Sequence, residues 1–85
     1  MASKRILKKH INYMIFDVVE ECFTVQAFNP KKVDDADKLI DDAAEFQDSI
    51  LSEINKAKSK KEFSAIITKI ESKHEEFVKG LNDLN

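Results

Sequence analysis

The sequence predicts an all-α fold, an up-down-up antiparallel three-helix bundle in which residues 1–85 form a single domain. The chain contains one glycine and one proline, too few turn residues for the several hairpins of a β domain. Three segments with helical apolar periodicity, about 4–28, 33–57 and 60–83, are separated by two short breaks. Short connections make consecutive helices antiparallel neighbours, which predicts the bundle.

The first helix is expected over residues 4–28, with Ser3 as its N-cap. Asn29 and Pro30 end it, because a residue before proline disfavours the α region. At about 100° per residue, its apolar positions gather on one face. This predicted core face consists of Leu7, Ile11, Met14, Ile15, Val18, Val19, Cys22 and Val25.

The second helix is expected over residues 33–57, and its core face includes one polar residue, Gln47. We expect Gln47 to be hydrogen-bonded and to help fix the helix register, as buried polar groups do. The whole predicted face is Ala36, Leu39, Ile40, Ala43, Gln47, Ile50, Leu51 and Ile54.

The third helix is expected over residues 60–83, after a capping box formed by Ser59 and Glu62. Gly80 is expected on the side opposite the core. The predicted core stripe is Phe63, Ile66, Ile67, Ile70, His74, Phe77, Leu81 and Leu84.

His74 is the strongest candidate for chemistry, because it falls within that apolar stripe and faces the small residue Ala43 in the expected register. A buried neutral histidine serves as a base or a ligand only when partners surround it. Cys22 is on a facing helix, but no carboxylate falls on the inner faces beside them. We therefore expect a structural histidine that is buried, neutral, and bonded to Gln47 or a backbone carbonyl.

The second helix is rich in acids, and Asp34, Asp37, Asp41 and Asp48 share its outer flank. An EF-hand needs alternating acidic ligands and a glycine turn, and neither occurs here. We expect these acids to form a solvated face whose first turn suits the helix dipole. No metal, cofactor or catalytic residue is predicted, and the protein is expected not to be an enzyme.

Composition limits the cellular compartment and the classes of binding partner that we expect for this protein. A net charge of −2 gives no overall attraction to nucleic acid, and a single cysteine suits a reducing compartment. No apolar run approaches the ~20 residues that span a bilayer. Lys8, Lys9, His10 and Asn12 interrupt any signal-peptide core, so a cytoplasmic protein that does not enter a membrane is expected.

The first helix carries more apolar surface than one core face requires. Phe16 and Phe23 project about 120–140° from its core axis, with Ile6 and Tyr13 further round. They form an exposed aromatic ridge, or else the helix crossing angles turn both rings into the core. On the first alternative, Tyr13, Phe16 and Phe23 are the expected interface of a homodimer or of a complex with a protein partner.

Charge is unevenly distributed along the chain. Residues 1–16 and 49–70 carry a net charge of +7, and residues 17–48 and 71–85 carry −9. In the expected bundle these two sets form opposite ends. The basic end is a candidate anion-binding site that we call the lysine pole, made of Lys4, Arg5, Lys8, Lys9, Lys56, Lys58, Lys60 and Lys61. The alternative is that surface charge merely follows the dipole of the second helix.

Three segments, Lys4 to Tyr13, Glu20 to Cys22 and Leu81 to Asn85, resemble a family of short, uncharacterised bacterial all-helical proteins. The resemblance covers about a quarter of the chain and contains no catalytic motif. It implies a small helical bacterial protein and no activity.

Two functions are expected from these features. The first is a non-enzymatic interaction protein that self-associates or docks a partner through the first helix. The second is weak binding of phosphate-bearing polyanions, nucleic acid included, by the lysine pole. Base readout is not expected, because Arg5 is the chain's one arginine and no aromatic residue is interleaved with the pole lysines for stacking.

Overall fold

The structure, a computed structural model, describes residues 4–84. They form α1 (Lys4–Phe28), a short 3-10 turn η1 (Pro30–Lys32), α2 (Val33–Lys56) and α3 (Lys60–Leu84), and this range contains no β-strand. The all-α class is therefore confirmed, and the expected ends of the second and third helices are each one residue off. Ser3, the expected N-cap, lies outside the described residues.

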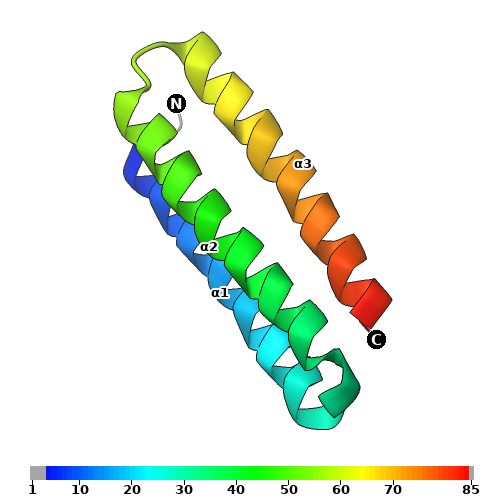
Figure 1. The fold of residues 1–85 in the computed structure, drawn as a ribbon. Coiled ribbons are helices and arrows are strands. Elements are labelled where there is room, and N and C mark those ends of the chain that lie inside the picture. The colour runs from blue at the N-terminus through cyan, green and yellow to red at the C-terminus, as the bar shows by residue number, and fades with distance from the viewer. Residues whose placement is uncertain (1–3, 85) are drawn as a thin grey trace.

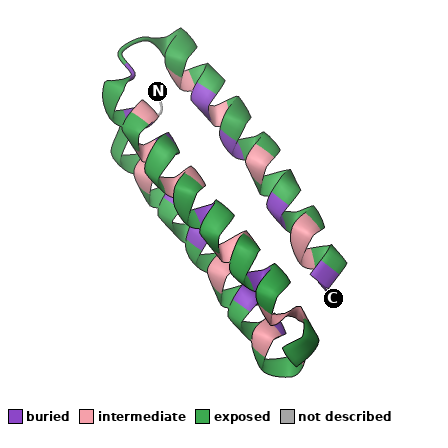
Figure 2. Cartoon of the chain, viewed as in Figure 1, coloured by how far each residue is buried: buried purple, intermediate pink, exposed green. Residues whose placement is uncertain are grey.

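Successive helices run in opposite directions along a narrow rod, as Figure 1 shows. The rod measures 45 × 17 × 17 Å, and each helix contacts both of the others. This arrangement leaves each helix with one face toward its neighbours and the remainder toward solvent. A bundle of this size therefore buries one stripe per helix, drawn in purple and pink in Figure 2.

The core faces expected of α1 and α2 are confirmed, because every position on them is buried or half-buried. On α1, Val19 is half-buried and the other seven positions are buried. Polar side chains at the edge of the contact between α1 and α2 are hydrogen-bonded to each other. Gln47 donates from Nε2 to Asn12 Oδ1 at 2.9 Å, and Gln26 donates to Asp37 Oδ1 at 2.7 Å. These bonds join α1 to α2 at two levels and help fix their register.

Both connections form as the sequence predicts. At the first, Asn29 N–H donates to Val25 O at 2.7 Å and Lys32 N–H donates to Asn29 O at 2.9 Å. At the second, Glu62 N–H donates to Ser59 Oγ at 3.1 Å, which confirms the cap. The Glu62 carboxylate accepts from Lys58 N–H at 2.8 Å. The carboxylate therefore reaches one residue beyond the N-cap that a standard capping box would bond.

The expected burial of His74 is wrong, because this side chain is exposed. The other seven positions of the predicted stripe are confirmed, because all of them are buried or half-buried. They are Phe63, Ile66, Ile67, Ile70, Phe77, Leu81 and Leu84. Lys73 and Gly80 are half-buried as well and extend the inward face. Phe77, seven residues after Ile70, is 1% exposed and lies edge-on to Phe46 with ring centroids 6.1 Å apart. Burying this large ring removes more apolar area from water than burying an imidazole, so α3 is rotated to favour it.

Lys73, the neighbour of His74, is half-buried at the edge of the inward face. Its Nζ lies 5.4 Å from the ring centroid of Phe77 and 6.0 Å from that of Phe46, and 3.1 Å from Glu76 Oε2. The lysine stem covers apolar surface while the ammonium remains at the rim, which a histidine is too short to do.

Gly80 was expected on the outer side of α3, and this is also wrong. A Cβ at Gly80 would lie 3.3 Å from Leu39 Cδ1 of α2. The glycine therefore allows the last turns of α3 to approach α2 closely. The same rotation of α3 that exposes His74 brings Gly80 to the inner face.

Candidate interaction surface

The aromatic side chains on the outside of α1 are exposed. Tyr13 is 62%, Phe16 64% and Phe23 57% exposed. The alternative in which helix crossing angles turn Phe16 and Phe23 into the core is therefore wrong. Apolar side chains exposed together in this way are uncommon on a monomer, and they mark a candidate docking surface.

These residues belong to a seven-residue repeat on the outside of α1. We call it the outer seam, which consists of Ile6, Lys9, Tyr13, Phe16, Glu20, Phe23 and Ala27. All seven are exposed, and they follow one another in steps of three and four residues, the spacing of a coiled-coil contact. Sequence reasoning found the aromatic members and missed Lys9 and Glu20, which the same seven-residue spacing identifies.

The outer seam lies beside the contact between α1 and α2 and is separate from the core. Asn12 and Gln26 mark where α1 meets α2, because both make hydrogen bonds to that helix. Phe16 follows Asn12 by four residues, which places it about 40° further round α1. Within the seam, Lys9 Nζ lies 5.9 Å from the centroid of the Tyr13 ring. The seam thus has its own apolar surface, with charged residues at two of its seven positions.

The lysine pole forms at one end of the rod. Figure 1 shows the start of α1 beside the connection between α2 and α3. Lys4 Nζ donates to Asn55 O at 2.8 Å and so ties these two segments together. Lys8 is half-buried, and the other seven members of the pole are exposed. Lys4 is therefore hydrogen-bonded to a carbonyl near the end of α2, and most of the other seven side chains are exposed to solvent.

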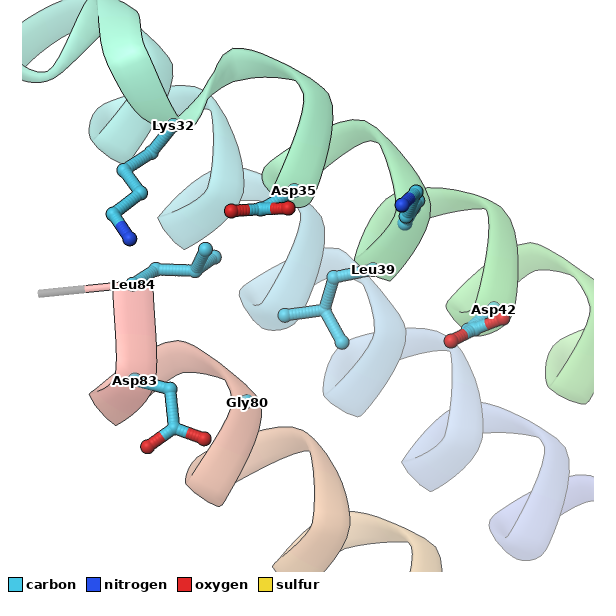
Figure 3. A pocket seen from close by; sticks show the side chains of 8 residues that line it. Lys32, Asp35, Leu39, Asp42, Gly80, Asp83 and Leu84 are labelled. Carbon is cyan, nitrogen blue, oxygen red and sulfur yellow. The ribbon is translucent and has the colours of Figure 1, made fainter.

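The opposite end has an open hollow of about 340 Å³ between α2 and the last turns of α3. In Figure 3, Leu39 lies at its floor opposite Gly80, whose missing side chain leaves that surface uncovered. The rim is charged, and the Asp83 carboxylate points away from Asp35 (Figure 3). The lining residues are Lys32, Asp35, Lys38, Leu39, Asp42, Gly80, Asp83 and Leu84. Their charged groups do not converge on one point, so the hollow is a weak candidate for a ligand site.

The groups considered for chemistry do not come together. Cys22 is a buried free cysteine, and burial together with the nearby negative charge of Glu21 raises the pKa of its thiol from its ordinary value. It is therefore protonated at neutral pH and a poor nucleophile. His74 is exposed on α3. Residues 4–84 contain no group of three or more His, Cys, Asp or Glu side chains placed to hold a metal ion.

In the same range, no helix combines the length and the apolar character needed to cross a membrane. Comparison with models of protein families, with curated protein sequences and with solved structures finds no match to this chain. Its function must therefore be inferred from its own surfaces.

Proposed function

We propose that this chain is a non-enzymatic interaction protein that associates through the outer seam of α1, with a second copy or with another protein. The supporting observation is the exposure of Tyr13, Phe16 and Phe23 on a single helix face. Fully burying one large apolar side chain is worth about 1.5–3 kcal/mol. Three such rings side by side therefore offer a partner a substantial gain.

The seam has no part in the core of the single chain. The buried residues of α1 lie on its other face and pack with those of α2 and α3. Substitutions on the seam should therefore leave the bundle folded, and this allows association to be tested separately from folding.

The test is the solution mass of a variant with Phe16→Asp and Phe23→Asp. We expect the wild-type chain to sediment at about twice 9.8 kDa at micromolar concentration and the variant to sediment as a folded monomer. Buried carboxylates in an apolar contact would oppose association, because a charge loses its hydration there. Circular dichroism at the same concentrations checks that both proteins remain helical.

The matched control carries Phe28→Asp and Val78→Asp. It makes the same change in charge at two other exposed apolar positions, one at the end of α1 and one on α3. We expect the control to sediment like the wild type. A wild-type chain that remains monomeric at several hundred micromolar contradicts self-association through the seam. A control that dissociates as readily as the seam variant contradicts the assignment of the contact to the seam.

A second candidate function is weak binding of phosphate-bearing polyanions at the lysine pole. It is supported by the position of these basic residues in the sequence, at the start of α1, the end of α2, the connection after it and the start of α3. Figure 1 shows that these segments lie at one end of the rod. The attraction would be mostly Coulombic and screened over about 8 Å at physiological salt. We therefore expect weak binding without sequence preference.

Chemical-shift perturbation with a short DNA duplex or polyphosphate tests this second function. We expect shifts at residues 4–10 and 56–63 at low salt, lost by a few hundred millimolar salt as counterions compete. A variant with Lys58, Lys60 and Lys61 changed to Gln should bind more weakly. The control changes Lys31, Lys38 and Lys79, which lie in the acidic segments, to Gln and should bind as the wild type does. Absence of shifts at low salt would show that the pole is ordinary solvated surface.

A further inference from the structure

The outer seam is complementary to itself when two copies lie antiparallel. We propose that two copies of this chain pair through α1 about a two-fold axis, with Tyr13 of each copy facing Phe16 of the other. This inference rests on the association proposed above. It specifies that the partner at the seam is a second copy of this chain, and it gives the orientation and register of the two helices.

The register follows from the order of residues along the seam. With Tyr13 facing Phe16, the antiparallel repeat sets Ile6 opposite Phe23 and Lys9 opposite Glu20. The two-fold axis repeats each of these pairs once. Every apolar residue in these layers thus meets an apolar residue, and every charged residue meets the opposite charge.

Other arrangements of the same seam are less favourable. Moving one helix by a single seven-residue repeat sets Phe16 against Glu20 in one direction, and Lys9 against Tyr13 in the other. A parallel pair sets Lys9 against Lys9 and Glu20 against Glu20. Like charges facing each other in an apolar contact disfavour that arrangement, as polar core residues do when they specify register in coiled coils.

The two charged seam residues are available for this pairing. Lys9 and Glu20 are both exposed, and neither forms an ion pair with another residue in the 4–84 range of its own chain. Lys9 already leans over the Tyr13 ring, with its ammonium 5.9 Å from the ring centroid. Its charge therefore lies beside one of the aromatic rings of the seam.

The charge of the whole chain favours the same orientation. α1 runs from the lysine pole toward the acidic end of the rod (Figure 1). Antiparallel pairing therefore sets the segments with a net charge of +7 in one copy beside those with −9 in the other. Complementary charge across an interface steers association and selects orientation.

Charge reversal at the seam is the experiment. Lys9→Glu alone, or Glu20→Lys alone, creates like-charge layers, and we expect each to weaken dimerisation by roughly tenfold or more. An equimolar mixture of the two single variants should recover dimers, because both layers are then complementary. The double variant, Lys9→Glu with Glu20→Lys, should also dimerise nearly as the wild type does. Analytical ultracentrifugation measures all four.

The matched control reverses exposed charges on α3, with Lys79→Glu and Glu75→Lys as single variants. We expect their dimer affinities to stay within about twofold of wild type, since surface charges away from an interface act weakly. If the seam variants behave like these controls, the proposed register is wrong. If the mixture of single variants fails to recover dimers, the register is equally wrong.

Orientation is tested directly by a nitroxide label at Thr24→Cys, an exposed position at the edge of the seam, with the buried Cys22 left in place. In the antiparallel pair Thr24 lies at the level of Arg5 of the other copy, so the two labels lie about 28 Å apart along the helix axis. Labels at half that distance or less would show a parallel pair and overturn the inference.

The experiments distinguish this inference from the proposed function. If the Phe16 and Phe23 variant is monomeric while the charge variants dimerise like the wild type, association through the seam is supported and the antiparallel register is wrong. A wild-type chain that never dimerises overturns this inference together with self-association.

Discussion

Individual side chains decide how α3 faces the rest of the bundle. Phe77 and His74 are three residues apart, yet Phe77 is 1% exposed and His74 lies in solvent. Phe77 is the one α3 residue among the largest fully buried side chains of the described chain, and burying its ring favours the observed rotation of the helix. The imidazole has no such preference, so it points outward and has no role in the core.

This difference predicts unequal effects of two substitutions on α3. Phe77→Ala should lower the free energy of unfolding by about 3–5 kcal/mol, because it removes a buried ring and leaves a cavity beside Phe46. His74→Ala should change it by less than about 0.5 kcal/mol. Urea unfolding at one fixed protein concentration measures both, since association would otherwise alter apparent stability. A large loss for His74→Ala would mean that the histidine does belong to the core.

At the scale of a whole helix, the three elements differ in how they use apolar residues. α2 and α3 have one apolar face each, and α1 has two, one in the core and one forming the outer seam. α3 has the less regular core face, since Lys73 and Gly80 lie on it among the apolar residues. At Gly80 the backbone of α3 therefore approaches α2 closely, and fewer side chains fill the space between these two helices than elsewhere in the core.

Gly80→Ala is predicted to stabilise that end of α3. Alanine in a helix interior is favoured over glycine by about 0.8–1 kcal/mol. The new Cβ would lie 3.3 Å from Leu39 Cδ1, so Leu39 must move by a few tenths of an ångström. Leu39 is half-buried and borders the open hollow, which gives it room. We expect the free energy of unfolding to rise by about 0.5–1 kcal/mol in urea titrations.

A double-mutant cycle with Leu39→Ala separates the two contributions to this effect. In that background the new methyl group meets no leucine, so Gly80→Ala should give the full helix-propensity gain. A net loss of stability from Gly80→Ala in the wild-type chain, and a gain in the Leu39→Ala chain, would show that Leu39 is held rigidly.

At the scale of the whole molecule, charge is segregated at some cost to stability. Lysines lie at the start of α1 and α3, where they oppose the helix dipole. In α2, by contrast, the first turn contains Asp34 and Asp35 and the last turn contains Lys56, which suits the dipole. Each lysine at the start of α1 or α3 costs about 0.3–1 kcal/mol before screening. An antiparallel dimer would offset this cost, because it sets each basic end beside an acidic end. The loss of dimer affinity proposed for reversing the charge of Lys9 or Glu20 has the same cause, which is opposite charges facing each other in the antiparallel dimer.

The sequence by itself determined the helical class, the helix ends to within one residue, the core faces of α1 and α2, and seven of the eight expected core positions of α3. These depend on local properties: apolar spacing, a proline after Asn29, and the Ser59 cap. Only the tertiary structure decided the exact rotation of α3, because a small rotation of this helix decides whether His74, Lys73 and Gly80, at the margin of its apolar stripe, face inward or outward. It also decided that Phe16 and Phe23 remain outside the core, since their burial depends on how closely the neighbouring helices cover α1. A single helix's periodicity reports which residues share a face, whereas the packing of three helices decides how much of that face is covered.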